Sequence, residues 1–121
     1  MKLTLAEVRW MQKGLSAITQ MSLPIRVSYK LSKLLTFCNK EMVSVEQARV
    51  GLVKRLAKPD PETHGELRVT VENEEVFRKE FEELLLEEVE LDFIPIKISE
   101  LGDDIKLSPM EMLSLTKVIE E

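Results

Sequence analysis

Residues 25–57 have the sequence IRVSYKLSKLLTFCNKEMVSVEQARVGLVKRLA, in which an apolar side chain returns every three or four positions. This near-heptad spacing predicts a single amphipathic helix from Ile25 to about Ala57. At about 1.5 Å per residue the helix would reach roughly 50 Å, which exceeds the width of a globule of this size. Its apolar positions are Val27, Leu31, Leu34, Cys38, Met42, Val45, Ala48, Leu52 and Val53 or Leu56.

A continuous helix over these residues is one of two alternatives. Ser44-Val45-Glu46-Gln47 has the form of a capping box, in which Ser44 and Gln47 could start a second helix. A continuous helix favours a coiled-coil partner or an oligomer, whereas a break near Ser44 favours a compact monomer. The apolar spacing alone leaves both open.

The residues before this segment predict a shorter helix. Thr4-Leu5-Ala6-Glu7 is a capping box, so the threonine oxygen would accept a hydrogen bond from the third helical amide while Glu7 reaches back. An apolar stripe continues to about Gln20, and Ser22-Leu23-Pro24 ends the helix. The stripe consists of Leu5, Val8, Met11, Leu15 and Ile18.

The residues after it predict short strands and two further helices. Residues 58–65 have the composition of a loop, and alternation over residues 66–71 predicts a half-buried strand. Asn73 is the predicted N-cap of an acidic helix, and Ser108-Pro109-Met110-Glu111 is a capping box for a last helix to about Glu120. The inner face of the acidic helix is predicted to be Val76, Phe77, Phe81, Leu84 and Leu85. A second strand is predicted at Val89, Leu91 and Phe93, followed by a bend, bulge or edge position at Pro95.

Together these elements predict one domain over residues 1–121 with a mainly helical α+β fold. Its basic helical part is residues 1–58, and its acidic α+β part is residues 59–121. A long central helix is accompanied by a short two-stranded β ribbon. Because two short strands are marginal alone, we expect oligomerisation to complete the ribbon and predict a homo-oligomer.

Composition excludes several classes of protein. The chain has 121 residues, 44% hydrophobic and 32% charged, which fits one soluble domain and excludes a large multi-domain enzyme. It lacks the run of about 18 to 20 apolar residues that spans a bilayer, so we predict no membrane partner and a cytoplasmic location. Cys38 and His64 are the only residues of their types, which excludes an internal disulfide and a Cys/His metal cluster. Cys38 is predicted to be buried, with a reactive thiol as the alternative.

No catalytic motif is present. The chain has no Gly-rich phosphate loop, nucleophile elbow or His-Glu-x-x-His sequence, so we predict no enzyme, no cofactor and no metal. His64 is expected to be a solvated loop residue, with a general base as the alternative. An acidic cluster could bind a hard cation, but it lacks the glycine and ligand spacing of a calcium loop. The cluster consists of Glu87, Glu88, Glu90 and Asp92.

The net charge of −5 is the sum of a basic first half and an acidic second half of the chain. Residues 1–58 carry eleven basic and three acidic residues, which gives +8, and residues 59–121 carry six basic and nineteen acidic residues, which gives −13. Such a chain can fold its acidic part over its basic part, pair head to tail with another copy, or present a cationic face to an anionic ligand.

The strongest polar cluster lies on one face of the predicted long helix, beside Phe37. Its residues could line a pocket for phosphates between two copies, with Arg26 as a bidentate fork and Tyr29 as a stacking face. The alternative is an exposed flank compensated by the acidic half. The acidic half would repel duplex nucleic acid, which is not a predicted partner. The candidate ligand-binding residues are Arg26, Tyr29, Lys30, Lys33 and Lys40.

Four segments carry a resemblance to a known group of proteins. They are LPIRVSYKLSK at residues 23–33, the helix continuing into EQAR at residues 46–49, and EEVELD at residues 87–92 with LSPME at residues 107–111. In order and spacing they resemble small uncharacterised proteins of tailed phages and prophages of Gram-positive bacteria. The resemblance implies a phage-encoded accessory protein, a viral protein in the host bacterial cytoplasm, and supplies no activity or catalytic residues.

Three functions are consistent with these observations. The first is non-enzymatic, stoichiometric sequestration of a host factor or an anionic nucleotide signal, as counter-defence or host modulation. The second is a virion structural or assembly protein, favoured by the long helix and the charge division. The third is a small enzyme with a dispersed carboxylate site. The basic helix face and the missing enzyme motifs favour the first.

Overall fold

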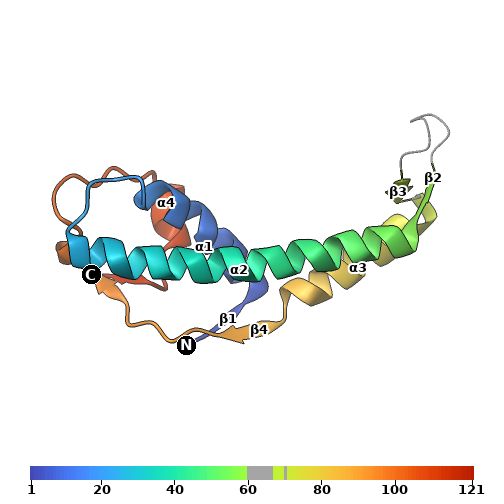
Figure 1. Cartoon of the computed structure of the whole chain (residues 1–121), viewed down its shortest axis with the longest axis horizontal. Helices are drawn as coiled ribbons and strands as arrows, with labels where there is room; N and C mark the ends of the chain where they lie inside the picture. The colour runs from blue at the N-terminus through green and yellow to red at the C-terminus, as the bar shows by residue number, and fades with distance from the viewer. Residues whose placement is uncertain (60–66, 70) are drawn as a thin grey trace.

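The computed structural model describes residues 1–59, 67–69 and 71–121. It confirms the predicted mainly helical α+β fold with a long central helix (Figure 1). In chain order the elements are β1 (Lys2–Thr4), α1 (Leu5–Ile18), α2 (Ile25–Leu56), β2 (Ala57–Pro59), β3 (Leu67–Val69), α3 (Val71–Leu85), β4 (Glu88–Glu90), β5 (Ile96–Lys97), the 3-10 helix η2 (Ile98–Leu101), α4 (Pro109–Ser114) and β6 (Ile119–Glu120).

Helix α2 is continuous over 32 residues and runs almost the length of the molecule (Figure 1). The alternative of a break near Ser44 is therefore wrong. Ser44 is exposed inside the helix, and its neighbour Val45 is buried, so the apolar stripe crosses the point where a second helix could have begun. Helix α1 packs on the first half of α2 and α3 on its second half (Figure 1).

Both predicted capping boxes are present. The Thr4 hydroxyl accepts from the Glu7 amide at 3.2 Å, and the Glu7 carboxylate accepts from the Thr4 amide at 3.0 Å. Glu7 also pairs with Lys117, and this contact is the main cause of the lowered pKa of the Glu7 carboxyl. Ser108 and Glu111 make the equivalent bonds at the start of α4.

The last helix ends at Ser114, so its predicted extension to Glu120 is wrong. The chain turns over residues 115–118 and then pairs as β6 with β5. This turn buries both Leu115 and Val118, and it places the Val118 carbonyl 2.8 Å from the Ile96 amide, which donates to it. Burial and strand pairing therefore override the local helical pattern.

Three two-stranded sheets occur among the described residues. β1 pairs antiparallel with β4, β2 antiparallel with β3, and β5 parallel with β6. The two predicted strands thus lie in different sheets, and each pairs with a strand that was not predicted. The second ends at Glu90, short of the predicted Leu91 and Phe93.

Two further expectations near the middle of the chain are corrected. Lys58 and Pro59, placed in a loop, belong to β2, because their backbone pairs with β3. Asn73 is not an N-cap, since α3 begins at Val71, and its side-chain amide instead donates to the Leu56 carbonyl at 2.9 Å. The rest of the predicted loop, including His64, lies outside the described residues.

The core lies between α1, the first half of α2 and the C-terminal segment. Every buried residue of α2 is at or before Val45. Gly14 lies where α1 crosses α4, and a Cβ atom there would stand 2.8 Å from Leu115 Cγ and 2.9 Å from the Glu111 carbonyl oxygen. The other buried core positions include Leu3, Val8, Met11, Leu15, Ile18, Leu31, Leu34, Leu91, Ile96, Leu101 and Val118.

Cys38 is fully buried in this core, as predicted. Burial, with a smaller contribution from the Glu41 carboxylate, raises the pKa of its thiol to about 11. We expect a thiol reagent to leave the native protein unlabelled at about pH 8 and to label one thiol per chain after unfolding, as counted by mass spectrometry. Rapid labelling of the native protein would show that Cys38 is accessible.

Candidate functional site

Three of the five predicted ligand-binding residues line one open groove of about 500 Å³. Tyr29, Lys30 and Lys33 stand along α2, and Phe37 continues the same wall one turn later. Arg26 and Lys40 share this helix face by their spacing, but they lie beyond the two ends of the groove. We call this site the lysine groove.

The opposite wall of the lysine groove comes from residues 90–94, far away in sequence. Its position follows from the β1–β4 pairing, in which Lys2 lies opposite Glu90. The N-terminal ammonium of Met1 donates to the Leu91 carbonyl at 2.9 Å, and the Leu91 amide donates to the Met1 carbonyl at 2.8 Å. These bonds tie the wall to the N-terminal strand β1. The residues of this wall are Glu90, Leu91, Asp92, Phe93 and Ile94.

The sequence pattern does not identify this wall as part of a binding site. Its acidic residues suggest a cation site or a dispersed carboxylate site from sequence, and its apolar residues suggest a strand. One local signal was available, because Ile94 follows Phe93 and breaks the alternation of a half-buried strand. In the structure Ile94 is 83% exposed, at the mouth of the groove.

The charges of the groove are divided between its walls. Lys30 and Lys33 lie on the α2 side, and Glu90 and Asp92 lie on the other side. Lys33 Nζ stands 5.3 Å from the centroid of the Tyr29 ring, within the range of a cation–π contact. None of the ion pairs between described residues includes Arg26 or the three candidate lysines.

The floor of the groove is apolar. Leu34 and Leu91 are nearly fully buried beneath it, while Tyr29 is 64% exposed at its rim. An apolar floor with a few charged groups at the edges is the usual construction of a small-molecule site, and the volume lies in the usual range. The lining residues offer charge, ring faces and apolar contact, which are the means of binding a ligand.

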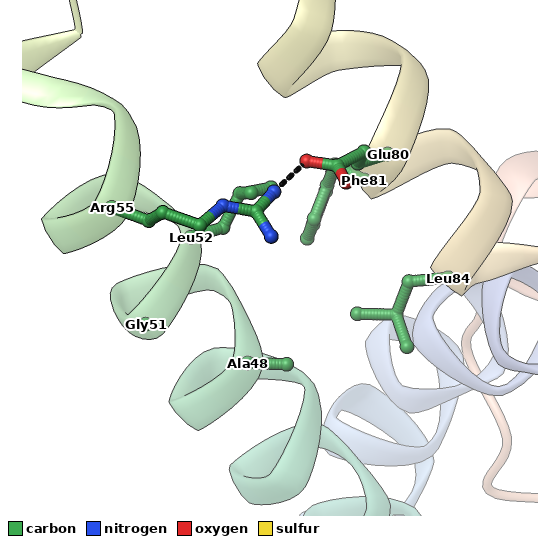
Figure 2. Close-up of a pocket in the computed structure, with 7 residues that line it drawn as sticks. All are labelled: Ala48, Gly51, Leu52, Arg55, Glu80, Phe81 and Leu84. Atoms are coloured by element: carbon green, nitrogen blue, oxygen red, sulfur yellow. Dashed lines mark hydrogen bonds and ion pairs between the residues drawn. The ribbon is translucent and has the colours of Figure 1, made fainter.

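A second, smaller groove of about 280 Å³ opens between α2 and α3 (Figure 2). Figure 2 shows Leu84 pointing toward α2 and an ion pair between Arg55 and Glu80 spanning the two helices. Its α2 residues lie on the same helix face as Lys30 and Lys33, because 18 residues make five helical turns. We call it the arm groove. It is lined by Ala48, Gly51, Leu52, Arg55, Glu80, Phe81 and Leu84.

The remaining candidates do not form a site in the described part of the chain. No group of three or more His, Cys, Asp and Glu side chains there is placed to hold a metal ion. This includes the acidic cluster of residues 87–92. His64 falls outside the described residues. Among the helices described, none is long and apolar enough to cross a membrane.

Comparisons with known proteins add no relative. No protein-family model, no curated protein and no solved structure gives a significant match to this chain.

Proposed function

We propose that this chain is a non-enzymatic binding protein that holds a nucleotide in the lysine groove. One observation carries the proposal: Lys30 and Lys33 stand over an apolar floor beside an exposed tyrosine, in an open groove of about 500 Å³. A nucleotide carries a group for each part of this groove. Its phosphate can bind the cations, its flat base can stack on the aromatic faces, and its hydroxyl groups can donate to the facing carboxylates.

Each wall of the groove has a distinct role in this proposal. Lys30 and Lys33 bind phosphate oxygens by charge-assisted hydrogen bonds. Tyr29 and Phe37 offer ring faces on which a base can stack. Asp92 accepts hydrogen bonds from ribose hydroxyls or from amino groups of the base. The carboxylates make the groove selective for ligands that carry donors as well as phosphate.

The biological role follows from the phage resemblance and remains part of the proposal. A phage-encoded protein that holds a host nucleotide signal stoichiometrically would act as counter-defence in the bacterial cytoplasm. A host protein segment is the alternative ligand of the same groove. A virion or assembly role is the second candidate, favoured by the continuous α2, and detection of the protein in purified particles would support it.

Reversing the charge of both groove lysines, Lys30 and Lys33, tests the site. We expect isothermal titration calorimetry against cyclic and linear ribonucleotides to show that one ligand binds per chain. Mass spectrometry of the ligand after the titration should show that it is chemically unchanged. The Lys30→Glu/Lys33→Glu variant should bind at least about 100-fold more weakly, because each lysine makes a charge-assisted contact. Both side chains are exposed, so the melting temperature should move by no more than about 2 °C.

A matched control separates the site from net charge. Lys13→Glu/Lys106→Glu makes the same charge change at two exposed lysines outside the groove, and it should keep the affinity. Equal loss in both double variants would show a general electrostatic effect. The absence of binding for every nucleotide at millimolar concentration would refute the nucleotide proposal. Turnover of a bound nucleotide would show that the protein is an enzyme and would contradict a purely binding function.

A further inference from the structure

The far half of α2 and helix α3 form a two-helix arm with little core of its own. The arm consists of residues 46–56 of α2 and residues 73–85 of α3. None of these residues is buried, whereas the first half of α2 has four buried positions. Phe77 and Phe81 stack with their ring centroids 6.0 Å apart, and both remain partly exposed. The arm therefore leaves apolar surface uncovered.

The uncovered surface is concave where the arm groove opens. Gly51 lies on this side of α2, and a Cβ atom built on it would meet nothing within 4 Å. Ala48 is one turn away, so this part of α2 carries only small side chains and another helix could approach it closely. Leu52, Phe81 and Leu84 supply the apolar surface that such a helix would cover.

The net charges of the two arm helices favour a second copy of this chain as the partner. Residues 46–56 carry three basic residues and one acidic residue, which gives +2. Residues 73–85 carry five acidic and two basic residues, which gives −3. A second copy offers a helix of opposite charge to each of these helices, provided that α2 of one copy lies on α3 of the other.

We propose that two copies of this chain pair through their arms into a four-helix bundle. A twofold axis along the arm places α2 of each copy on α3 of the other, so that every helix has oppositely charged neighbours. The arm grooves close against each other and bury Leu52, Phe81 and Leu84. Because both grooves share one face of α2, this pairing also turns the two lysine grooves toward each other across the twofold axis, at one end of the dimer.

Gly51→Lys tests the pairing without disturbing the single chain. We expect sedimentation velocity to give twice the 13.9 kDa chain mass for the wild type at micromolar concentration, and one chain mass for Gly51→Lys. The new side chain enters open space in the monomer but fills the arm groove that the partner needs. Ser32→Lys adds the same charge at an exposed α2 position outside the arm, and it should remain dimeric.

Salt separates this arrangement from a merely apolar contact. Raising the NaCl concentration from about 0.05 M to about 0.5 M should weaken the wild-type dimer by about tenfold, because opposite charges face each other. A monomeric wild type, or a Gly51→Lys variant that stays dimeric, would overturn the proposal. A dimer that tightens in salt would overturn the placement of α2 on α3. A Gly51→Lys variant that fails to fold would contradict the open space at Gly51 on which the proposal rests, and the salt series on the wild type would still test the pairing.

Discussion

Gly14→Ala is expected to lower the free energy of unfolding by about 2 kcal/mol, even though alanine is the better helix former. The added Cβ would stand 2.8 Å from Leu115 Cγ and 2.9 Å from the Glu111 carbonyl oxygen. The carbonyl belongs to the α4 backbone, so α1 and α4 must move apart to accept the methyl group. That movement opens the core around Leu15 and Leu115, which are both fully buried.

Thermal unfolding followed by circular dichroism checks this expectation, with a fall in melting temperature of about 8 °C. Gly51→Ala is the matched control when both variants are compared as monomers, because it makes the same change in a helix where a Cβ meets nothing within 4 Å in the same chain. This control should gain about 0.5 to 1 kcal/mol from helix propensity. Gains of the same size at both glycines would show that α1 and α4 are not in close contact.

Ser44→Pro is expected to cost about 3 kcal/mol, or about 12 °C in melting temperature. Ser44 lies in the interior of α2, where its amide belongs to the helical hydrogen-bond ladder. Proline removes that donor, and its ring meets the carbonyl of the preceding turn. Helical circular dichroism should fall as well, because the break separates the arm from the core half of α2.

Ser44→Ala distinguishes a continuous helix from a broken one by the sign of its effect. In a continuous helix the change should stabilise the protein by about 0.5 kcal/mol, because Ser44 is exposed and alanine is the better helix former. If Ser44 were instead an N-cap, losing its hydroxyl should cost about 1 kcal/mol. A loss of that size would contradict the continuous helix.

The predictable parts of this fold are those that local contacts determine. The capping boxes at Thr4 and Ser108 join groups three residues apart, so the tetrapeptides suffice to identify them. Ser44-Val45-Glu46-Gln47 has the same form and makes no cap. Nothing in the tetrapeptide reveals the burial of Val45, which holds the helix through this point. A capping box therefore identifies a possible helix start, and tertiary packing determines whether it is used.

The unpredicted parts depend on contacts between distant residues. β1, β2 and β6 have two or three residues each, too few for an alternating pattern, and each exists because another strand lies beside it. The lysine groove likewise has one wall that depends on local sequence and one that depends on contacts between distant residues. Helical spacing places Tyr29, Lys30 and Lys33 on one face, but the wall at residues 90–94 requires the β1–β4 pairing. One wall of the groove could thus be predicted from sequence and the other could not.

The pairing of β1 with β4 also determines the order in which a nascent chain can fold. Lys2 finds its partner Glu90 only after residue 90 has left the ribosome, and closing so long a loop is slow. Until then α1 and α2 can pair, but the stripe that later meets Leu91, Ile96 and Leu101 stays open to water. We therefore expect a nascent chain to expose an apolar helical surface until residues 91–101 have been made and can cover it.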